Sequence, residues 1–138
     1  MLNKEDVSRL SKEAMEKLKD LTGSYDGFYI SHGCALVMHG LREETNDVDA
    51  GVDSKIFDEI KDDYYLDLDG RRINDFVNGL DLHREDLEGV EREPDIVLMD
   101  GVPVATLNQV IKEKKELGRE KDFEQIKLIE TYMKNQSK

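Results

Sequence analysis

The chain has 138 residues and a formal net charge of −12, and 38% of the residues are charged. This length suits one domain with a real core, and no apolar run approaches the roughly 20 residues that cross a bilayer. The acidic excess argues against broad nucleic-acid binding, because that requires clustered Lys and Arg to meet the phosphates.

Two further features indicate the compartment. The first residues, Met1 to Asp6, lack the basic flank and apolar block of a secretory signal. Cys34 is the only cysteine, so no internal disulfide can form. Together these features predict a cytoplasmic protein, and Cys34 is expected to be a small core residue and not a nucleophile.

Apolar spacing predicts the elements of the first half. Positions such as Val7, Leu10 and Ala14 recur every three or four residues, which predicts an amphipathic helix over 3–21 that ends near Gly23. Four elements are expected to follow: a strand over 27–30, a buried helix over 34–39, a strand over 47–52 and a helix over 54–61 that Ser54 caps.

Turn signals divide the second half. Asp69-Gly70 predicts a hairpin that joins residues 64–69 to 71–77, with Ile73, Asp75 and Val77 on one face. Residues 80–87 are either a strand or an irregular segment. The remaining elements are expected to be strands over 95–99 and 102–105, helices over 107–117 and 123–133, and a frayed tail over 134–138.

These elements predict a single mixed α/β (α+β) domain over residues 1–138. A central mixed sheet is expected to be flanked by helices. The N-terminal helix falls within residues 1–22 and two C-terminal helices fall within residues 106–134.

The strand over 47–52 carries two acidic residues. Asp47 and Asp49 are two residues apart, so both side chains point to one face, while Val48, Ala50 and Val52 face the other way. Carboxylates this close repel one another. A divalent cation such as Mg²⁺ removes the conflict and prefers oxygen ligands.

Gly33 lies between a predicted strand and a predicted helix. A glycine there lets the backbone approach a phosphate, beside the free N–H groups at the start of the helix. A tight turn with no ligand explains the residue equally well. His32 next to it is either a donor to a phosphate or a plain turn residue, and His39 and His83 are expected to be structural or exposed.

Two stretches taken together resemble a known family. They are Ile30-Ser31-His32-Gly33-Cys34-Ala35-Leu36, and then His39-Gly40-Leu41-Arg42, Thr45 and Asp47-Val48-Asp49. They resemble the nucleotidyltransferase superfamily, which has the DNA polymerase β-type fold, and are closest to its small bacterial and phage branch. Lys114 and Gly118-Arg119, followed by Lys121-Asp122, resemble the ending of that branch. His32 stands where the family has the first glycine of a pair, and Gly33 matches the second.

The resemblance implies a metal-dependent enzyme. Asp47 and Asp49 would bind Mg²⁺ or Mn²⁺, and a third carboxylate on a later strand would complete the site. Asp75 is expected there, with a possible second role as base, and Asp67 and Asp69 are its competitors. Two cations about 3.5–4 Å apart would clamp an in-line displacement, in which an acceptor hydroxyl attacks the α-phosphate of a nucleoside triphosphate such as ATP.

The resemblance also implies residues that contact the phosphates of the nucleotide, and for two of them a surface ion pair is the alternative. His32 and Gly33 are expected beside the phosphates, and Lys114 and Arg119 are expected either to meet phosphate or to form surface ion pairs. Asp122 would then pair with Arg119. Most lysines of residues 112–121 are expected on a solvated helix face.

The acceptor is open among a small molecule, a protein and RNA, and a homodimer would supply a missing wall of the site. The rival function is a non-catalytic binding protein of the same fold, either a toxin–antitoxin component or a phage regulator.

Overall fold

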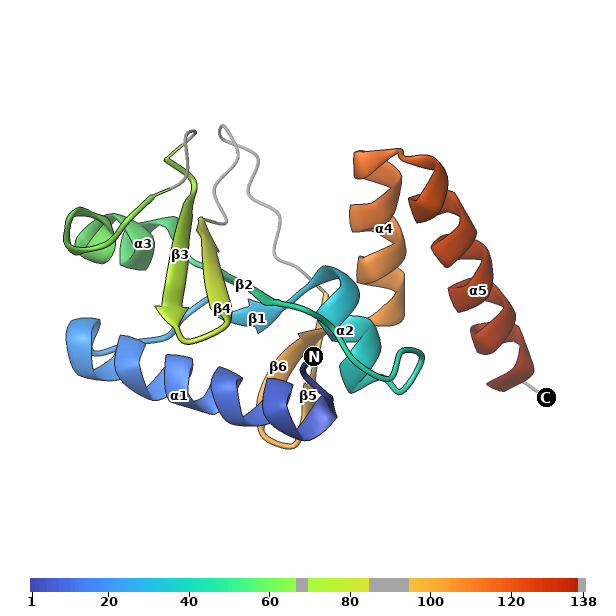
Figure 1. Ribbon diagram of the computed structural model, residues 1–138, viewed down its shortest axis with the longest axis horizontal. Coiled ribbons are helices and arrows are strands. Elements are labelled where there is room, and N and C mark those ends of the chain that lie inside the picture. Colours follow the sequence, from blue (N-terminus) through green and yellow to red (C-terminus); the bar gives the residue numbers. More distant parts are fainter. Residues whose placement is uncertain (67–69, 85–94, 137–138) are drawn as a thin grey trace.

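The computed structural model describes residues 1–66, 70–84 and 95–136 (Figure 1). Within these ranges the chain forms five α-helices, one short 3₁₀ helix and six strands. The helices are α1 (Lys4–Thr22), α2 (His32–Met38), α3 (Ser54–Ile60), η1 (Lys61–Asp63), α4 (Leu107–Leu117) and α5 (Glu120–Gln136). The strands are β1 (Tyr29–Ile30), β2 (Val48–Val52), β3 (Arg72–Val77), β4 (Leu80–Arg84), β5 (Ile96–Met99) and β6 (Val102–Ala105).

The strands form one mixed sheet in the order β3-β4-β2-β1-β6-β5. β2 pairs with β4 and β1 pairs with β6 in parallel, whereas the other neighbours are antiparallel. The predicted class, mixed α/β with helices around a central sheet, is therefore confirmed for the described residues.

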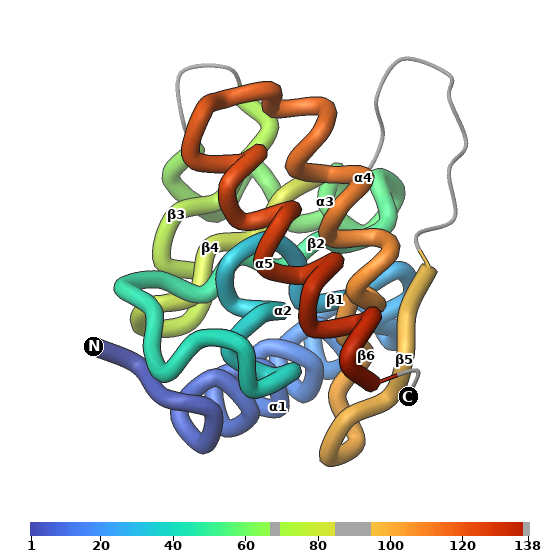
Figure 2. Tube along the Cα trace, turned by 90° about the vertical axis from the view of Figure 1, so that its right-hand side faces the viewer, coloured from blue at the N-terminus to red at the C-terminus, as the bar shows by residue number. Residues whose placement is uncertain are grey.

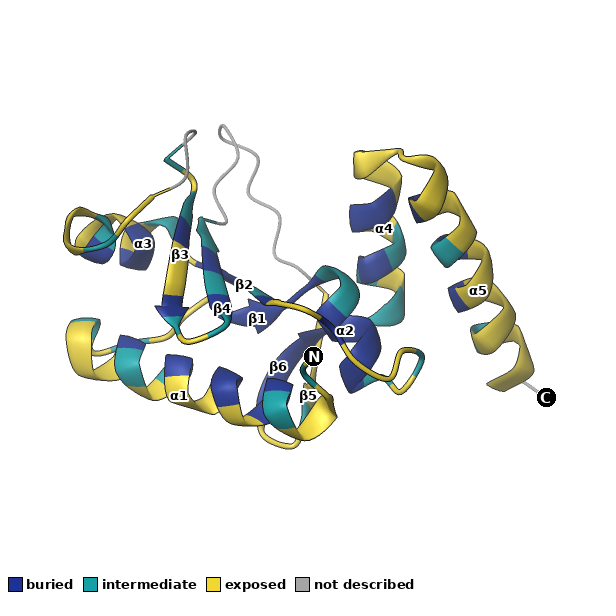
Figure 3. Cartoon of the chain, in the orientation of Figure 1, coloured by how far each residue is buried: buried dark blue, intermediate teal, exposed yellow. Residues whose placement is uncertain are grey.

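Helix α1 covers one face of the sheet. Its buried residues include Val7, Leu10, Ala14 and Leu18, which recur at the spacing that predicted the helix. Asn3 caps its start through a reciprocal pair of hydrogen bonds with Asp6. Figure 3 shows the buried side of α1 turned toward the strands and its other side exposed. The opposite face of β2 and β4 is therefore free of α1.

The hairpin predicted before β3 can be assessed only in part, because residues 67–69, with Asp67 and Asp69, lie outside the described residues. Its described parts do meet: Leu66 forms an isolated antiparallel bridge with Ile73, and the backbone N–H of Asn74 donates to the carbonyl of Tyr65 at 3.2 Å. A further hairpin joins β3 to β4 around the Asn78-Gly79 turn. Residues 80–87 were expected to form either a strand or an irregular segment. Residues 80–84 form strand β4, and residues 85–87 lie outside the described ranges.

A bulge in β3 breaks its alternation. The register with β4 shifts between Ile73 and Val77, and Asp75 has a left-handed backbone with φ 52°. Ile73 and Phe76 are consequently buried while Asp75 is exposed. The expectation that Ile73, Asp75 and Val77 share one face is wrong, because the extra residue resets the two-residue period of the strand.

Several helix boundaries also differ from the prediction. α2 begins at His32 and not at Cys34. Asp53, and not Ser54, caps α3 by accepting a hydrogen bond from the backbone N–H of Lys55 at 2.8 Å. α5 extends to Gln136, so the first three residues of the predicted tail are helical.

The C-terminal helices α4 and α5 lie side by side, with α5 outermost (Figure 2). α4 contacts α2 and β6, and so joins this pair to the sheet. The start of α4 and the Gly118 end of α4 agree with the prediction. No helix of the described residues is both long and apolar enough to cross a membrane.

Candidate functional site

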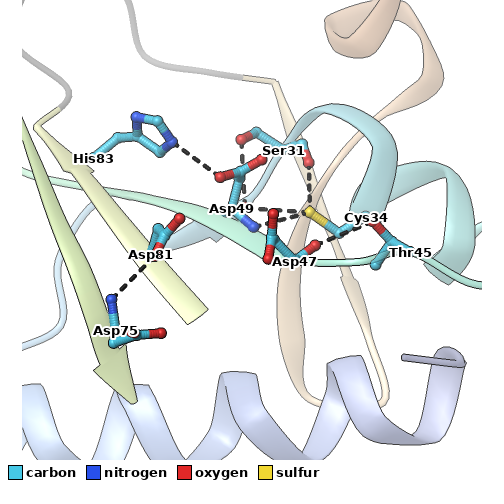
Figure 4. Close-up of polar contacts among 8 residues, drawn as sticks. All are labelled: Ser31, Cys34, Thr45, Asp47, Asp49, Asp75, Asp81 and His83. Atoms are coloured by element: carbon cyan, nitrogen blue, oxygen red, sulfur yellow. Dashed lines mark hydrogen bonds and ion pairs between the residues drawn. The ribbon is translucent and has the colours of Figure 1, made fainter. Parts of the chain in front are cut away.

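The face of the sheet opposite α1 carries the acidic residues. Asp49 of β2 lies in register with Asp81 of β4, between the buried pairs Val48–Leu80 and Ala50–Leu82. Paired residues on parallel strands point the same way, and neighbouring strands are about 4.8 Å apart. The two carboxylates are therefore side by side and directed away from the core (Figure 4).

Asp81 did not emerge as a site residue in the sequence. The available signal was the alternation of Leu80 and Leu82 with Asp81 and His83, which is the pattern of a strand with one polar face. The pattern cannot give the register of this strand with β2, and without the register Asp81 is one acidic residue among 32.

Asp47 precedes β2 and is exposed. The buried side chain of Thr45 donates a hydrogen bond to the backbone oxygen of Asp47 at 3.1 Å. Thr45 also bridges to Leu2 at the start of the chain. These contacts fix the backbone before β2 and leave the carboxylate of Asp47 in solvent.

Asp75 lies on β3, next to β4. Its backbone N–H donates to Oδ1 of Asp81 at 3.0 Å, so the bulge that contains Asp75 holds the Asp81 carboxylate (Figure 4). Three aspartates from β2, β3 and β4, and one directly before β2, thus lie on this part of the sheet: Asp49, Asp75, Asp81 and Asp47. We refer to them as the acidic cluster.

His83 contacts Asp49 directly. Its Nε2 lies 3.2 Å from Oδ1 of Asp49, and each side chain is about one-third exposed. Burial raises the pKa of Asp49, but the hydrogen bond and charge of His83, together with His32 and Arg72, bring the pKa below its ordinary value of 3.8. Asp49 is therefore ionised at neutral pH. His83 was expected to be structural or exposed, and the structure places it in the site.

Cys34 and Ser31 form hydrogen bonds with the backbone of Asp49. Sγ of Cys34 accepts the backbone N–H of Asp49 at 3.1 Å and donates to the carbonyl of Ser31 at 3.0 Å. The backbone N–H of Ser31 donates to the carbonyl of Asp49 at 3.1 Å. Burial raises the pKa of the Cys34 thiol to about 12. The prediction of a core residue is confirmed, since this buried and neutral thiol lacks the character of a nucleophile.

His32, and not Gly33, has the left-handed backbone that favours glycine. Its φ is 53°, whereas Gly33 does not have a positive φ and lies in the first turn of α2. Burial lowers the pKa of His32 below 6.5, and His83, Lys114 and Arg119 also lower it, against the opposing effect of Asp49. The imidazole is therefore neutral at pH 7. Its Nδ1 is buried and has no hydrogen-bond partner among the described residues.

The basic residues of the C-terminal helices surround a buried carboxylate. Asp122 is 0% exposed; its oxygens accept from Nε of Arg119 at 2.7 Å and lie 3.8 Å from Nζ of Lys114. The expected Asp122–Arg119 pair is confirmed. The solvated face expected for most of these lysines is found for Lys112, Lys115 and Lys121. Lys114 was expected to meet phosphate or to form a surface ion pair; its pair with Asp122 is buried and not at the surface. His39, by contrast, has the expected structural role, with Nε2 2.8 Å from the carbonyl of Ala105.

The donor set of the acidic cluster suits a hard cation. In residues 1–66, 70–84 and 95–136, no three His, Cys, Asp or Glu side chains are arranged as a ready metal-binding group. Mg²⁺ sites commonly use only one or two carboxylates and obtain further ligands from water and substrate phosphates. Asp49 and Asp81, with exposed Asp47 beside them, therefore fit such an ion by their chemistry.

We compared the chain with family models, with curated proteins and with solved structures, and none of them matches it.

Proposed function

We propose that the protein is a Mg²⁺- or Mn²⁺-dependent nucleotidyltransferase of the DNA polymerase β-type fold. The observation that supports this most strongly is the in-register pair Asp49–Asp81 on the face of the sheet opposite α1. Two carboxylates placed side by side offer a hard cation oxygen ligands from two neighbouring strands. The start of α2 adjoins the pair through Ser31 and Cys34.

Asp47 and Asp49 are the proposed metal ligands, and the third carboxylate comes from β3 or β4. Asp75 was expected from the sequence, and Asp81 is the better placed of the two because it is paired with Asp49, whereas Asp75 lies on β3, which is separated from β2 by β4. The metal would supply charge neutralisation at the α-phosphate of the nucleoside triphosphate. His83 would hold Oδ1 of Asp49 and so fix the orientation of that carboxylate.

The test is transfer of label from each α-labelled nucleoside triphosphate, with Mg²⁺ or Mn²⁺ and with a cell extract as the source of acceptors. Wild type is compared with the double variant Asp47→Asn, Asp49→Asn and with the single variants Asp75→Asn and Asp81→Asn. Asp20→Asn, at an exposed position of α1, is the matched control. We expect transfer by wild type and by the control, none by the double variant, and a larger loss for Asp81→Asn than for Asp75→Asn.

A second readout is thermal stability, because a nucleotide with metal at about 100 times its Kd stabilises the fold by about 2.7 kcal/mol. If wild type neither transfers label nor gains stability from metal and nucleotide, the proposal is wrong.

The alternative is a non-catalytic binding protein of the same fold, either a toxin–antitoxin component or a phage regulator. One observation favours it: His32 places an imidazole with a left-handed backbone where the family has glycine. Stabilisation of wild type by nucleotide and metal, without label transfer to any acceptor, would favour this alternative over the enzyme.

A further inference from the structure

The guanidinium of Arg42 lies against Gly33, which is the glycine in the first turn of α2. A Cβ on Gly33 would be 2.7 Å from Nη1 of Arg42 and 3.8 Å from its Cζ. Arg42 belongs to the segment between α2 and β2, and its guanidinium returns to the first turn of α2. Gly33 therefore leaves room for this guanidinium, which would have to shift if position 33 carried a side chain, and Gly33 does not have a left-handed backbone.

Positive charge converges at this place in a strongly acidic chain. Burial lowers the pKa of Lys114, the charges of Asp122 and Glu113 oppose this effect, and those of Arg119 and Arg42 add to it. Lys114 and Arg119 in turn lower the pKa of His32, the neighbour of Gly33. Cations from three segments thus act on one another beside His32, although the net charge of the chain is −12.

Arg42 differs from the other two cations in its partners. Lys114 and Arg119 both pair with the buried Asp122. Within the described residues no carboxylate lies within ion-pairing distance of Arg42, and its side chain is exposed. An anion bound at Arg42 would therefore supply the ion-pair partner that the described residues do not supply.

We propose that Arg42 binds the polyphosphate tail of the ligand at this site. The planar guanidinium offers paired N–H donors that match two phosphate oxygens, which an ammonium group cannot do. Gly33 positions this group by leaving room for it, and Lys114 and Arg119 add positive potential. The proposal rests on the proposed function for the identity of the ligand as a nucleoside triphosphate, but anion binding by Arg42 does not require the metal.

Binding of inorganic tripolyphosphate in the presence of EDTA tests the proposal without the metal or the reaction. The full chain is titrated by calorimetry as wild type, Arg42→Ala, Arg42→Lys and the control Arg9→Ala, whose exposed side chain lies on α1. We expect Arg42→Ala to weaken binding roughly 10- to 100-fold, the loss typical of hydrogen bonds to charged groups. Arg42→Lys should lose less affinity, and Arg9→Ala should bind as wild type does.

Gly33→Ala provides a structural control, because its methyl group displaces the guanidinium without removing it. It should weaken tripolyphosphate binding in wild type and have no further effect in Arg42→Ala, since the displaced group is then absent. Equal effects of Gly33→Ala in both backgrounds would contradict a role through Arg42.

The outcomes separate this proposal from the proposed function. Binding that depends on Arg42 and survives in Asp47→Asn, Asp49→Asn supports the anion site even if no label is transferred. Label transfer by wild type with tripolyphosphate affinity and nucleotide KM unchanged in Arg42→Ala would overturn the role of Arg42 and leave the enzyme intact. Failure of wild type to bind tripolyphosphate would also overturn it.

Discussion

Replacing His32 by glycine and by alanine separates backbone strain at this position from the role of the imidazole. With φ 53°, His32 is in the left-handed region, which costs a residue with a Cβ about 1–2 kcal/mol. Glycine avoids this cost but loses roughly 0.5–1 kcal/mol through its greater freedom in the unfolded chain. Both variants lack the ring, so its contribution cancels. We therefore expect His32→Gly to be more stable than His32→Ala by about 1 kcal/mol.

Urea unfolding followed by circular dichroism measures this difference as a shift of the midpoint at constant slope. In a thermal melt it corresponds to about 3–5 °C for a chain of this size. Lys112, exposed within α4, is the matched control position. There the order must reverse, with Lys112→Gly about 1 kcal/mol less stable than Lys112→Ala.

If His32→Gly is no more stable than His32→Ala, the backbone at position 32 is not strained and the reasoning is wrong. Comparison of the nucleotide affinities of these two variants also tests the proposed function, because His32→Gly introduces the glycine that the nucleotidyltransferase family has at this position. Higher nucleotide affinity in His32→Gly than in His32→Ala would assign the effect to the backbone and not to loss of the ring.

Two further predictions concern titrating groups near the site. Because burial raises the pKa of Cys34 from 9.0 to about 12, its thiolate at pH 8 is about 1,000-fold rarer in the folded protein than in the unfolded chain. Iodoacetamide should therefore alkylate the folded protein at least about 1,000-fold more slowly than the denatured protein. Two alkylation rates within tenfold of each other would contradict this prediction. The hydrogen bond from Arg119 lowers the pKa of Asp122 below its ordinary 3.8, so the ionised group stabilises the fold above that pH and the contribution is lost as the pH falls through the folded pKa. In urea unfolding, Asp122→Asn should be less stable than wild type at pH 7 and approach it below pH 3.8, and a difference that stays constant down to pH 3 would refute the assignment.

Local patterns in the sequence determined most of the elements. The helical spacing of Val7, Leu10 and Ala14 and the alternation of β2 depend only on neighbours along the chain, so α1 and the outward direction of Asp49 follow from them. The Asp122–Arg119 pair is similarly local, since its members lie one turn apart. Burial of Cys34 followed from the apolar run around it.

Only the tertiary structure decided which residues meet. Asp81 joins Asp49 through the register of two parallel strands that are distant in the chain, and no local pattern specifies a register. The bulge at Asp75 exposes that residue by resetting the strand period. The contact between Arg42 and Gly33 depends on the path of the segment after α2. The sequence thus established that Asp47 and Asp49 face away from the core, and the fold determined which carboxylate and which cation lie beside them, because both depend on contacts between segments far apart in the sequence.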